Sequence, residues 1–361
     1  MAMRAQAYGH KVSSFSVQSY KMDQAIRSFS GTKPNTYTAG PSAGSNAEKF
    51  YGAVNIPGGK VLHIPYSKGN VGISDPVAGT YTEADAVPVG SARFRGGCYH
   101  ADTGLVVMAP LLSPNIGLYD VLRKEFRLGP VLGSGTIGYF GAVVSSITNK
   151  VILVPGTKTT IGIYDPVTNE FTEGPAHGGT GSPYFCGAEE LPNGKILLIP
   201  FSSQAFKLYD PVTNTISNGP TGIVSSAYHG SSKLPSGDVV CTPYSATTIS
   251  IYRWRSNTQY TIPAPAGGAK FRGSAPVADG RIIFPPNNYD RVGWYDPATN
   301  SYGESDALGL GTISKFSGAV QAANGVVLLS PYAAENIGQF KAVSAGALPF
   351  DAMLSIQWNK N

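Results

Sequence analysis

Charged residues, cysteines and long apolar runs are all scarce in this sequence of 361 residues. Asp, Glu, Lys and Arg together make up only 14%, which leaves little for charged amphipathic helices and favours many short strands joined by turns. No run of about 18 apolar residues is present, so we expect no membrane-spanning helix. The cysteines, Cys98, Cys186 and Cys241, are odd in number and widely spaced, which argues against a disulfide framework and against a zinc site.

The first 34 residues are more basic than the rest of the chain. They lack the apolar core of a secretory signal and carry a net charge of +4, whereas the whole chain carries +5. Because residues 35–361 are therefore nearly neutral, we do not expect this body to bind nucleic acid. We interpret residues 1–34 as a basic arm that either lies on its own domain or docks the protein onto a partner. The candidate docking residues are Arg4, Lys11, Lys21, Arg27 and Lys33.

Glycine (44), proline (27) and tyrosine (20) are abundant, and they recur with a period of 42–46 residues. The clearest copies are "NKVILVPGTKTTIGIYDPVTNEFTEGP" (149–175) and "GKILLIPFSSQAFKLYDPVTNTISNGP" (194–220). A regular period of this length indicates a repeat architecture. A proline closes the apolar run of each copy, at Pro65, Pro110, Pro155, Pro200, Pro243, Pro285 and Pro331.

Two further sequence features, which we call anchors together with these prolines, recur with the same period across the seven units. One is an aromatic residue, any residue and then glycine, and the other is an aspartate-proline turn that usually follows a tyrosine. The middle residues of the first anchor are Tyr51, Arg95, Phe140, Cys186, His229, Arg272 and Ser317. The turn aspartates are Asp75, Asp120, Asp165, Asp210 and Asp296, and Arg253 and Lys341 occupy the corresponding places in units five and seven.

Each unit divides into four short strands separated by turn residues. The first begins at the aromatic-x-Gly anchor, the second is the apolar run that proline ends, the third ends at the aspartate, and the fourth alternates β-favouring residues. Four antiparallel strands per unit, repeated seven times, predict an all-β, seven-bladed β-propeller over residues 35–361. A β-solenoid is the alternative, but its repeats are usually shorter.

The segment "PNTYTAGP" (34–41) resembles the fourth strand of a unit, although no complete unit precedes it. The seventh unit lacks a fourth strand after Phe340. We therefore predict that residues 35–41 complete blade seven as its outer strand and close the ring, which leaves no unpaired blade edge.

The aromatic-x-Gly residues should surround one mouth of the central channel, on the face that also carries the loops between strands two and three. Two arginines, a histidine and a tyrosine there would suit a carboxylate or a sugar. Packing between blades is the alternative role for these side chains. The candidate ligand-binding residues are Tyr51, Arg95, His229, Arg272, Tyr66, Lys68, Tyr244, Asn287 and Tyr332.

The sequence offers little for catalysis. His229 is the one histidine placed at the mouth, carboxylates are sparse on that face, and no nucleophile elbow, phosphate loop or metal-ligand spacing is present. We therefore expect a protein that is not an enzyme and that uses no cofactor or metal.

The Tyr-Asp-Pro-x-Thr-Asn turns at 164–169, 209–214 and 295–300 resemble those of kelch and galactose-oxidase-like propellers. The chain departs from that pattern, because proline replaces the Gly-Gly pair and Phe171, Ile216 or Tyr302 replaces the tryptophan. The copper site of those oxidases needs two histidines, so it does not carry over. Uninterrupted proline-anchored repeats are also similar to propellers of bacteriophage tail or fibre proteins.

This resemblance implies a structural or receptor-binding propeller of a larger assembly, in a virion as a tail, fibre or decoration protein. The arm would dock it to other structural proteins, and the loop face would contact a partner or a surface glycan. The alternatives are a stand-alone lectin-like propeller, in the cytoplasm or released without a signal peptide, and a hydrolase or oxidase with its site in the funnel.

Overall fold

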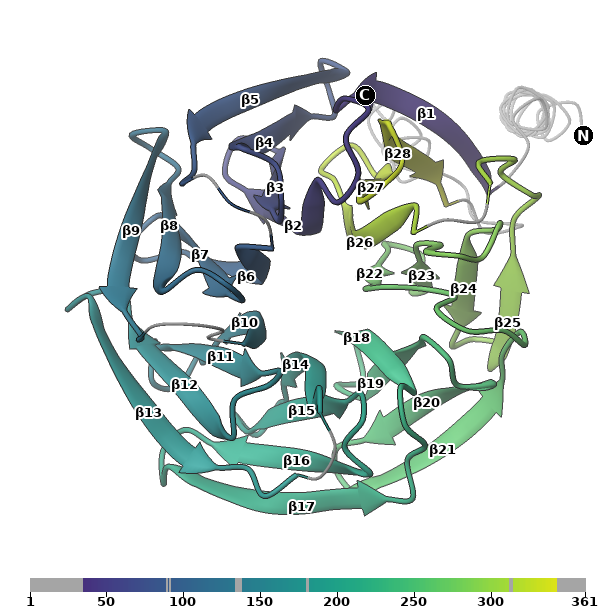
Figure 1. Cartoon of the computed structure of the whole chain (residues 1–361). Helices are drawn as coiled ribbons and strands as arrows, with labels where there is room; N and C mark the ends of the chain where they lie inside the picture. Colours follow the sequence, from purple (N-terminus) through teal and green to yellow (C-terminus); the bar gives the residue numbers. More distant parts are fainter. Residues whose placement is uncertain are drawn as a thin grey trace, which may run out of the picture. The chain divides into compact units, whose positions relative to one another are not determined.

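The computed structural model describes residues 35–88, 90, 92–133, 138–179, 182–311 and 314–342. Within these residues it contains 28 strands and no helix, arranged as seven four-stranded blades around a central channel (Figure 1). The predicted all-β, seven-bladed propeller is confirmed. It forms one compact unit, Tyr37–Lys341. The basic arm, with Arg4, Lys11, Lys21, Arg27 and Lys33, lies outside the described residues.

Each blade is a meander of consecutive strands. Blade one holds β2 (Phe50–Ile56), β3 (Lys60–Pro65), β4 (Asn70–Asp75) and β5 (Thr80–Ala86). Blade two holds β6 (Phe94–His100), β7 (Leu105–Pro110), β8 (Asn115–Asp120) and β9 (Glu125–Val131). Blade three holds β10 (Tyr139–Val144), β11 (Val151–Pro155), β12 (Thr160–Asp165) and β13 (Glu170–Ala176). Blade four holds β14 (Phe185–Glu190), β15 (Ile196–Pro200), β16 (Ala205–Asp210) and β17 (Thr215–Thr221).

The remaining blades follow the same order. Blade five holds β18 (Tyr228–Lys233), β19 (Val239–Pro243), β20 (Thr248–Arg253) and β21 (Thr258–Pro263). Blade six has shorter strands, β22 (Ala275–Pro276), β23 (Ile282–Phe284), β24 (Gly293–Asp296) and β25 (Ser301–Glu304). Blade seven holds β26 (Phe316–Gln321), β27 (Val327–Pro331), β28 (Asn336–Lys341) and, from the other end of the sequence, β1 (Thr36–Ser42).

The first strand of each blade lies nearest the channel, and in every blade but the sixth it is bulged at the aromatic-x-Gly anchor. In blade six the anchor precedes β22, and Phe271 makes an isolated bridge to Pro286. In β18, Tyr228 pairs with Pro243 and Ser231 pairs with Cys241, so two residues, His229 and Gly230, fall outside the regular register. Gly230 has a φ of 96°, which a residue with a side chain adopts only with strain. A bulge of this kind re-aims the side chain next to it, here toward the channel.

The aspartate-proline turns form because the aspartate side chain satisfies the turn's own backbone. Oδ1 of Asp165 accepts hydrogen bonds from the amides of Val167 (3.0 Å) and Thr168 (3.3 Å). The turn ends at Asn169, whose φ is 59° and whose side chain accepts a hydrogen bond from the Tyr164 hydroxyl at 2.9 Å. Asp75, Asp120, Asp210 and Asp296 cap their turns in the same way.

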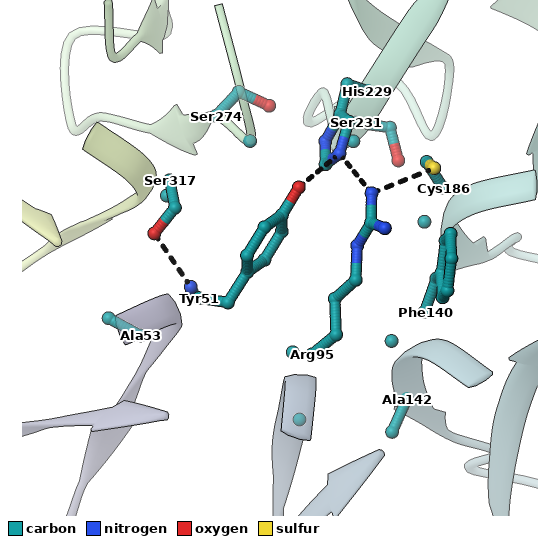
Figure 2. Close-up of a pocket in the computed structure, with 18 of the residues that line it drawn as sticks. Tyr51, Ala53, Arg95, Phe140, Ala142, Cys186, His229, Ser231, Ser274 and Ser317 are labelled. Carbon is teal, nitrogen blue, oxygen red and sulfur yellow. Dashed lines mark hydrogen bonds between the residues drawn. The ribbon is translucent and has the colours of Figure 1, made fainter. Parts of the chain in front are cut away.

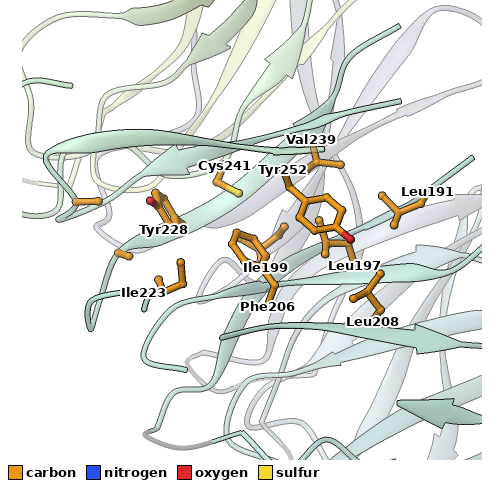
Figure 3. Packing of buried hydrophobic residues seen from close by; sticks show 12 residues of the cluster. Leu191, Leu197, Ile199, Phe206, Leu208, Ile223, Tyr228, Val239, Cys241 and Tyr252 are labelled. Carbon is orange, nitrogen blue, oxygen red and sulfur yellow. The ribbon is translucent and has the colours of Figure 1, made fainter. Parts of the chain in front are cut away.

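The core consists of apolar layers between neighbouring blades. Between blades four and five these layers interlock Leu197, Ile199, Phe206, Tyr228, Cys241 and Tyr252, of which Tyr228 is 4% exposed and the others are fully buried (Figure 3). Burying an aliphatic or aromatic side chain of this size stabilises a fold by about 1.5–3 kcal/mol. All three cysteines are free thiols.

Strand β1 closes the ring at blade seven, as predicted. It lies beside β28 as the outer strand, where the Asn336 side-chain amide donates to the carbonyl of Gly40 at 2.8 Å. The amide of Ala43 donates to the carbonyl of Glu335 at 2.8 Å, and the ring of Tyr37 lies 6.1 Å from that of Phe316. The first and last strands of the propeller therefore share one sheet.

Candidate functional site

A central cavity of about 190 Å³ is lined by glycine, alanine and serine residues of the inner strands and by the middle residues of six of the seven anchors, Tyr51, Arg95, Phe140, Cys186, His229 and Ser317. We define the mouth cluster as five of these lining residues, Tyr51, Arg95, Phe140, Cys186 and His229, together with five residues that contact them, Tyr66, Phe201, Tyr244, Arg272 and Tyr332. Figure 2 shows Tyr51, Arg95 and His229 pointing toward one another across the cavity from three different blades. The repeat thus places six different kinds of side chain at equivalent positions of the seven blades, with arginine occurring twice.

His229 is the hub of the cluster. Its Nε2 lies 2.6 Å from the Tyr51 hydroxyl and 2.7 Å from Nη2 of Arg95. Because a guanidinium can only donate, Nε2 must accept, and the imidazole is neutral with its proton on Nδ1. Burial, and then the charges of Arg95 and Arg272, hold the pKa of His229 well below its usual 6.5.

Arg95 is surrounded by weak acceptors and aromatic faces. Its guanidinium carbon stacks 3.6 Å from the centroid of the Phe140 ring and 4.6 Å from that of Tyr51. Nη2 also contacts Sγ of Cys186 at 3.5 Å. Burial raises the pKa of that thiol to about 11, although both arginines act in the opposite direction, so Cys186 remains protonated and is a poor nucleophile.

Arg272, from blade six, does not line the cavity but contacts the aromatic side chains of the cluster. Its Nη2 donates to the Tyr244 hydroxyl at 3.3 Å, and its guanidinium carbon lies 5.4–5.7 Å from the ring centroids of Tyr51, Tyr244 and Tyr332. The Nε atoms of Arg272 and Arg95 are both buried without a hydrogen-bond partner. Among the described residues, no carboxylate forms an ion pair with either arginine.

An aromatic rim surrounds these cations. The ring centroids of Tyr51, Tyr66 and Tyr332 lie 5.4–5.8 Å apart, and Phe201 and Tyr244 lie within 6 Å of His229. Phe201 was missed by the sequence-based prediction, although a signal was present. The residue after the strand-two proline is Tyr66, Leu111, Gly156, Phe201, Tyr244, Pro286 and Tyr332 in successive units, so this column of the repeat identifies the rim.

Seven of the nine predicted ligand-binding residues converge on the mouth cluster. The other two make different contacts. Lys68 forms an ion pair with Glu83 at 2.7 Å and donates to the carbonyl of Ala43. Asn287 is fully buried, and its side-chain amide donates to the carbonyl of Phe316. These two residues hold loops between blades.

Buried cations beneath the loops of this face were not predicted. Lys49, Lys270 and Lys315 precede the anchor aromatic in their units and are at most 2% exposed. Lys270 donates to the carbonyls of Ala246 and Gly267, both at 2.8 Å, and Lys315 donates to that of Tyr289 at 3.0 Å. A basic residue immediately before aromatic-x-Gly was the available signal, and its role is to fasten the loops around the mouth.

A second cavity, of about 700 Å³, lies farther along the same inner strands. Glu189, Lys233, Asn55, Gln321 and several serines line it. Oε1 of Glu189 accepts a hydrogen bond from Ser231 at 3.3 Å, and burial raises the pKa of this carboxyl to about 7, against the effects of Lys233 and Ser231. The inner strands therefore present cations at the mouth cluster and a carboxyl group in this second cavity.

In the part of the chain that the structure describes, no group of three or more His, Cys, Asp or Glu is placed to hold a metal ion. The same residues include no helix that could span a membrane.

Comparison with known proteins shows similarity at the level of the fold. No protein-family model and no curated protein sequence matches the chain. Among solved structures, virginiamycin B lyase from Staphylococcus aureus superposes with a TM-score of 0.72 at 13% identity, covering 86% of this chain and all of that one. A histidine-to-alanine variant of that lyase, described as catalytically inactive and solved with quinupristin, gives a TM-score of 0.74 at 12% identity with the same coverage.

Hydrazine synthase from Kuenenia stuttgartiensis is also similar, with a TM-score of 0.65 at 14% identity over 86% of this chain and 99% of that one. At such identities these likenesses establish a shared β-propeller fold and no activity. These neighbours are neither kelch proteins nor phage proteins.

Proposed function

We propose that this chain is a non-enzymatic binding propeller that serves as a receptor-binding element of a larger assembly such as a phage virion, docked through residues 1–34. The face that carries the mouth cluster would contact the receptor. The observation that carries this proposal is the mouth cluster itself, in which Arg95 and Arg272 lie inside an aromatic rim without a carboxylate partner. Concave sites with aromatic walls and a few oriented polar groups are typical of ligand recognition.

The charge states of the cluster support binding rather than catalysis. His229 is held neutral while its Nε2 accepts from Arg95, so it is a weak base at neutral pH. The Cys186 thiol stays protonated, and burial raises the pKa of the Tyr51 phenol as well. A binding site needs such fixed, preorganised groups, whereas general acid–base catalysis needs a group that titrates near the working pH.

A second candidate is an enzyme at the same cavity. It is favoured by the 2.6 Å contact between His229 and Tyr51, and by fold neighbours that include a lyase whose histidine-to-alanine variant is described as inactive. The test is incubation of the chain with quinupristin, followed by mass spectrometry. A product that forms with the wild-type chain but not with His229→Ala would replace the binding proposal by the enzymatic one.

The binding proposal is tested in two steps. The full-length chain and Arg95→Ala/Arg272→Ala are applied to a glycan array and to host-cell envelopes, and we expect the double variant to lose binding while it keeps its melting temperature within a few degrees. Separately, a chain lacking residues 1–34 should fold but fail to enter the assembled particle. Unchanged binding by the double variant would remove the mouth cluster from the proposed function.

A further inference from the structure

We propose that the mouth cluster recognises an acidic sugar, with the sugar's carboxylate held between the guanidinium groups of Arg95 and Arg272. This inference rests on the proposed binding function and narrows its ligand to one chemical class. It is carried by the charge, the unused hydrogen-bond donors and the aromatic rim of the mouth cluster.

The charge of the mouth cluster is unbalanced. The guanidinium carbons of Arg95 and Arg272 both lie within 6 Å of the centroid of the Tyr51 ring, and no described carboxylate pairs with either of them. Placing two like charges in a partly desolvated site costs free energy unless an anion offsets them. Arginine is also the side chain best matched to a carboxylate, because its planar fork can donate two parallel hydrogen bonds.

Several donors in the cluster lack a full-strength acceptor. The Nε atoms of Arg95 and Arg272 are buried and unpartnered, which is rare for polar atoms in a finished interior. Tyr51 and Arg95 also share the single lone pair of His229 Nε2, at 2.6 and 2.7 Å. An incoming carboxylate has about four lone-pair sites and would relieve this shortage of acceptors.

The aromatic rim around the two arginines suits a sugar ring. Tyr66 and Tyr244 are partly exposed, and Tyr332 and Phe201 complete an aromatic surface around the cations. Aromatic faces offer a flat apolar surface to the C–H face of a pyranose, and the tyrosine hydroxyls can hydrogen-bond to its hydroxyl groups.

The test compares acidic sugars with neutral counterparts that differ only in the carboxylate. Methyl glucuronide is titrated against methyl glucoside, methyl galacturonide against methyl galactoside, and inorganic sulfate is titrated alone, all with the full-length wild-type chain in a calorimeter. We expect at least one uronide to bind at least tenfold more tightly than its neutral partner, because charge-assisted hydrogen bonds to arginine are the strongest this site can make.

Substitutions of the two arginines test whether the uronide binds at the mouth cluster. Arg272→Gln and Arg95→Gln should each lower the uronide affinity at least tenfold. Arg255→Gln is the matched control, because Arg255 also stacks on an aromatic ring, that of Trp254 at 4.6 Å, but is exposed in the turn between β20 and β21, away from the cavity. It should leave the affinity unchanged.

The outcomes separate this inference from the proposed function. Equal binding of neutral and acidic sugars would overturn the carboxylate assignment and leave the binding propeller intact. Sulfate binding as tight as uronide binding would reduce the site to a general anion site and overturn sugar recognition. If no uronide binds, the inference is wrong, while the particle-incorporation experiment still decides the proposed function. The ligand comparison uses only the wild-type chain, so it remains decisive if an arginine variant fails to fold.

Discussion

At the scale of single residues, burial sets charge states that water would not allow. His63 is fully buried, with its ring nitrogens 2.9 and 3.0 Å from the hydroxyls of Ser74 and Ser330. Burial lowers the pKa of His63 to about 3, so this side chain stays neutral where a free histidine would be charged. Burial shifts the pKa of Glu189 in the opposite direction, upward, so its carboxyl stays protonated to about pH 7.

These shifts predict opposite slopes of stability against pH. Glu189 has a raised pKa in the folded chain, so the folded state binds more protons than the unfolded state between about pH 4.5 and 7, and its contribution to stability is lost as pH rises through that window. His63 has a lowered pKa, so its contribution to stability is lost as pH falls from about 6.5 toward 3.

The substitution Glu189→Gln isolates the contribution of the Glu189 carboxyl to the pH dependence of stability. We expect the difference in melting temperature between Glu189→Gln and the wild-type chain to grow in favour of the variant as pH rises from 4.5 to 7.5, because the variant has no charge to form in the cavity. Scanning calorimetry of both chains at half-unit pH steps measures this. Parallel curves across that range would show that Glu189 ionises as readily in the folded chain as in water.

At the scale of elements, the bulge at the aromatic-x-Gly anchor, present in every blade but the sixth, links the fold to the site. In every blade but the third, a Cβ built on the anchor glycine would contact the anchor glycine of the next blade, so neighbouring blades come close where the chain has no side chain. A Cβ built on Gly230 would lie 2.8 Å from Cα of Gly273, and one on Gly318 would lie 2.8 Å from Cα of Gly52. The anchor's glycine therefore permits both the turn of the mouth residue and the closeness of the blades.

Gly230→Ala should destabilise the propeller strongly. The new methyl group would meet backbone of the neighbouring blade, and the φ of 96° would add strain of about 1–3 kcal/mol. Gly58→Ala is the control, because Gly58 has a φ of 81° and open space around its Cβ position. Urea unfolding of both variants separates the two effects: a similar loss for both would mean that strain alone acts and that the contact between blades costs nothing.

The sequence anchors predicted where the mouth residues lie but not which contacts their side chains make. The aromatic-x-Gly spacing correctly placed Tyr51, Arg95, His229 and Arg272 at one mouth, because a repeat puts equivalent positions at equivalent places. It could not predict that Arg95 would stack on Phe140 and reach His229, since that depends on side-chain directions across the channel. Lys68 and Asn287 were grouped with the mouth because their loops share its face, yet their side chains fasten neighbouring loops.

At the scale of the whole propeller, the blade count, the strand order and the closing strand were all predictable from the sequence. Three anchors in fixed phase determine the number of units, and the strand left over at residues 35–41 matches the one that unit seven lacks. The short strands of blade six were not predicted, because the sequence of this unit contains the same anchors as units with longer strands. Only the observed strand pairing shows that Phe271 makes an isolated bridge to Pro286. The period does not predict the function of the mouth, because the residue at that position varies from unit to unit and only arginine occurs twice.

Ring closure gives the last prediction. Without β1, the outer edge of β28 would be unpaired and Phe316 would lose the contact of Tyr37, so a chain that begins at residue 43 should melt on the order of 10 °C lower than one that begins at residue 35. The open edge should also promote self-association, visible by size-exclusion chromatography. A synthetic peptide of residues 35–42, added in excess, should restore much of the lost stability by adding a strand to that edge. A peptide with the same residues in scrambled order is the control, since restoration by both would mean that β1 stabilises blade seven without a specific register.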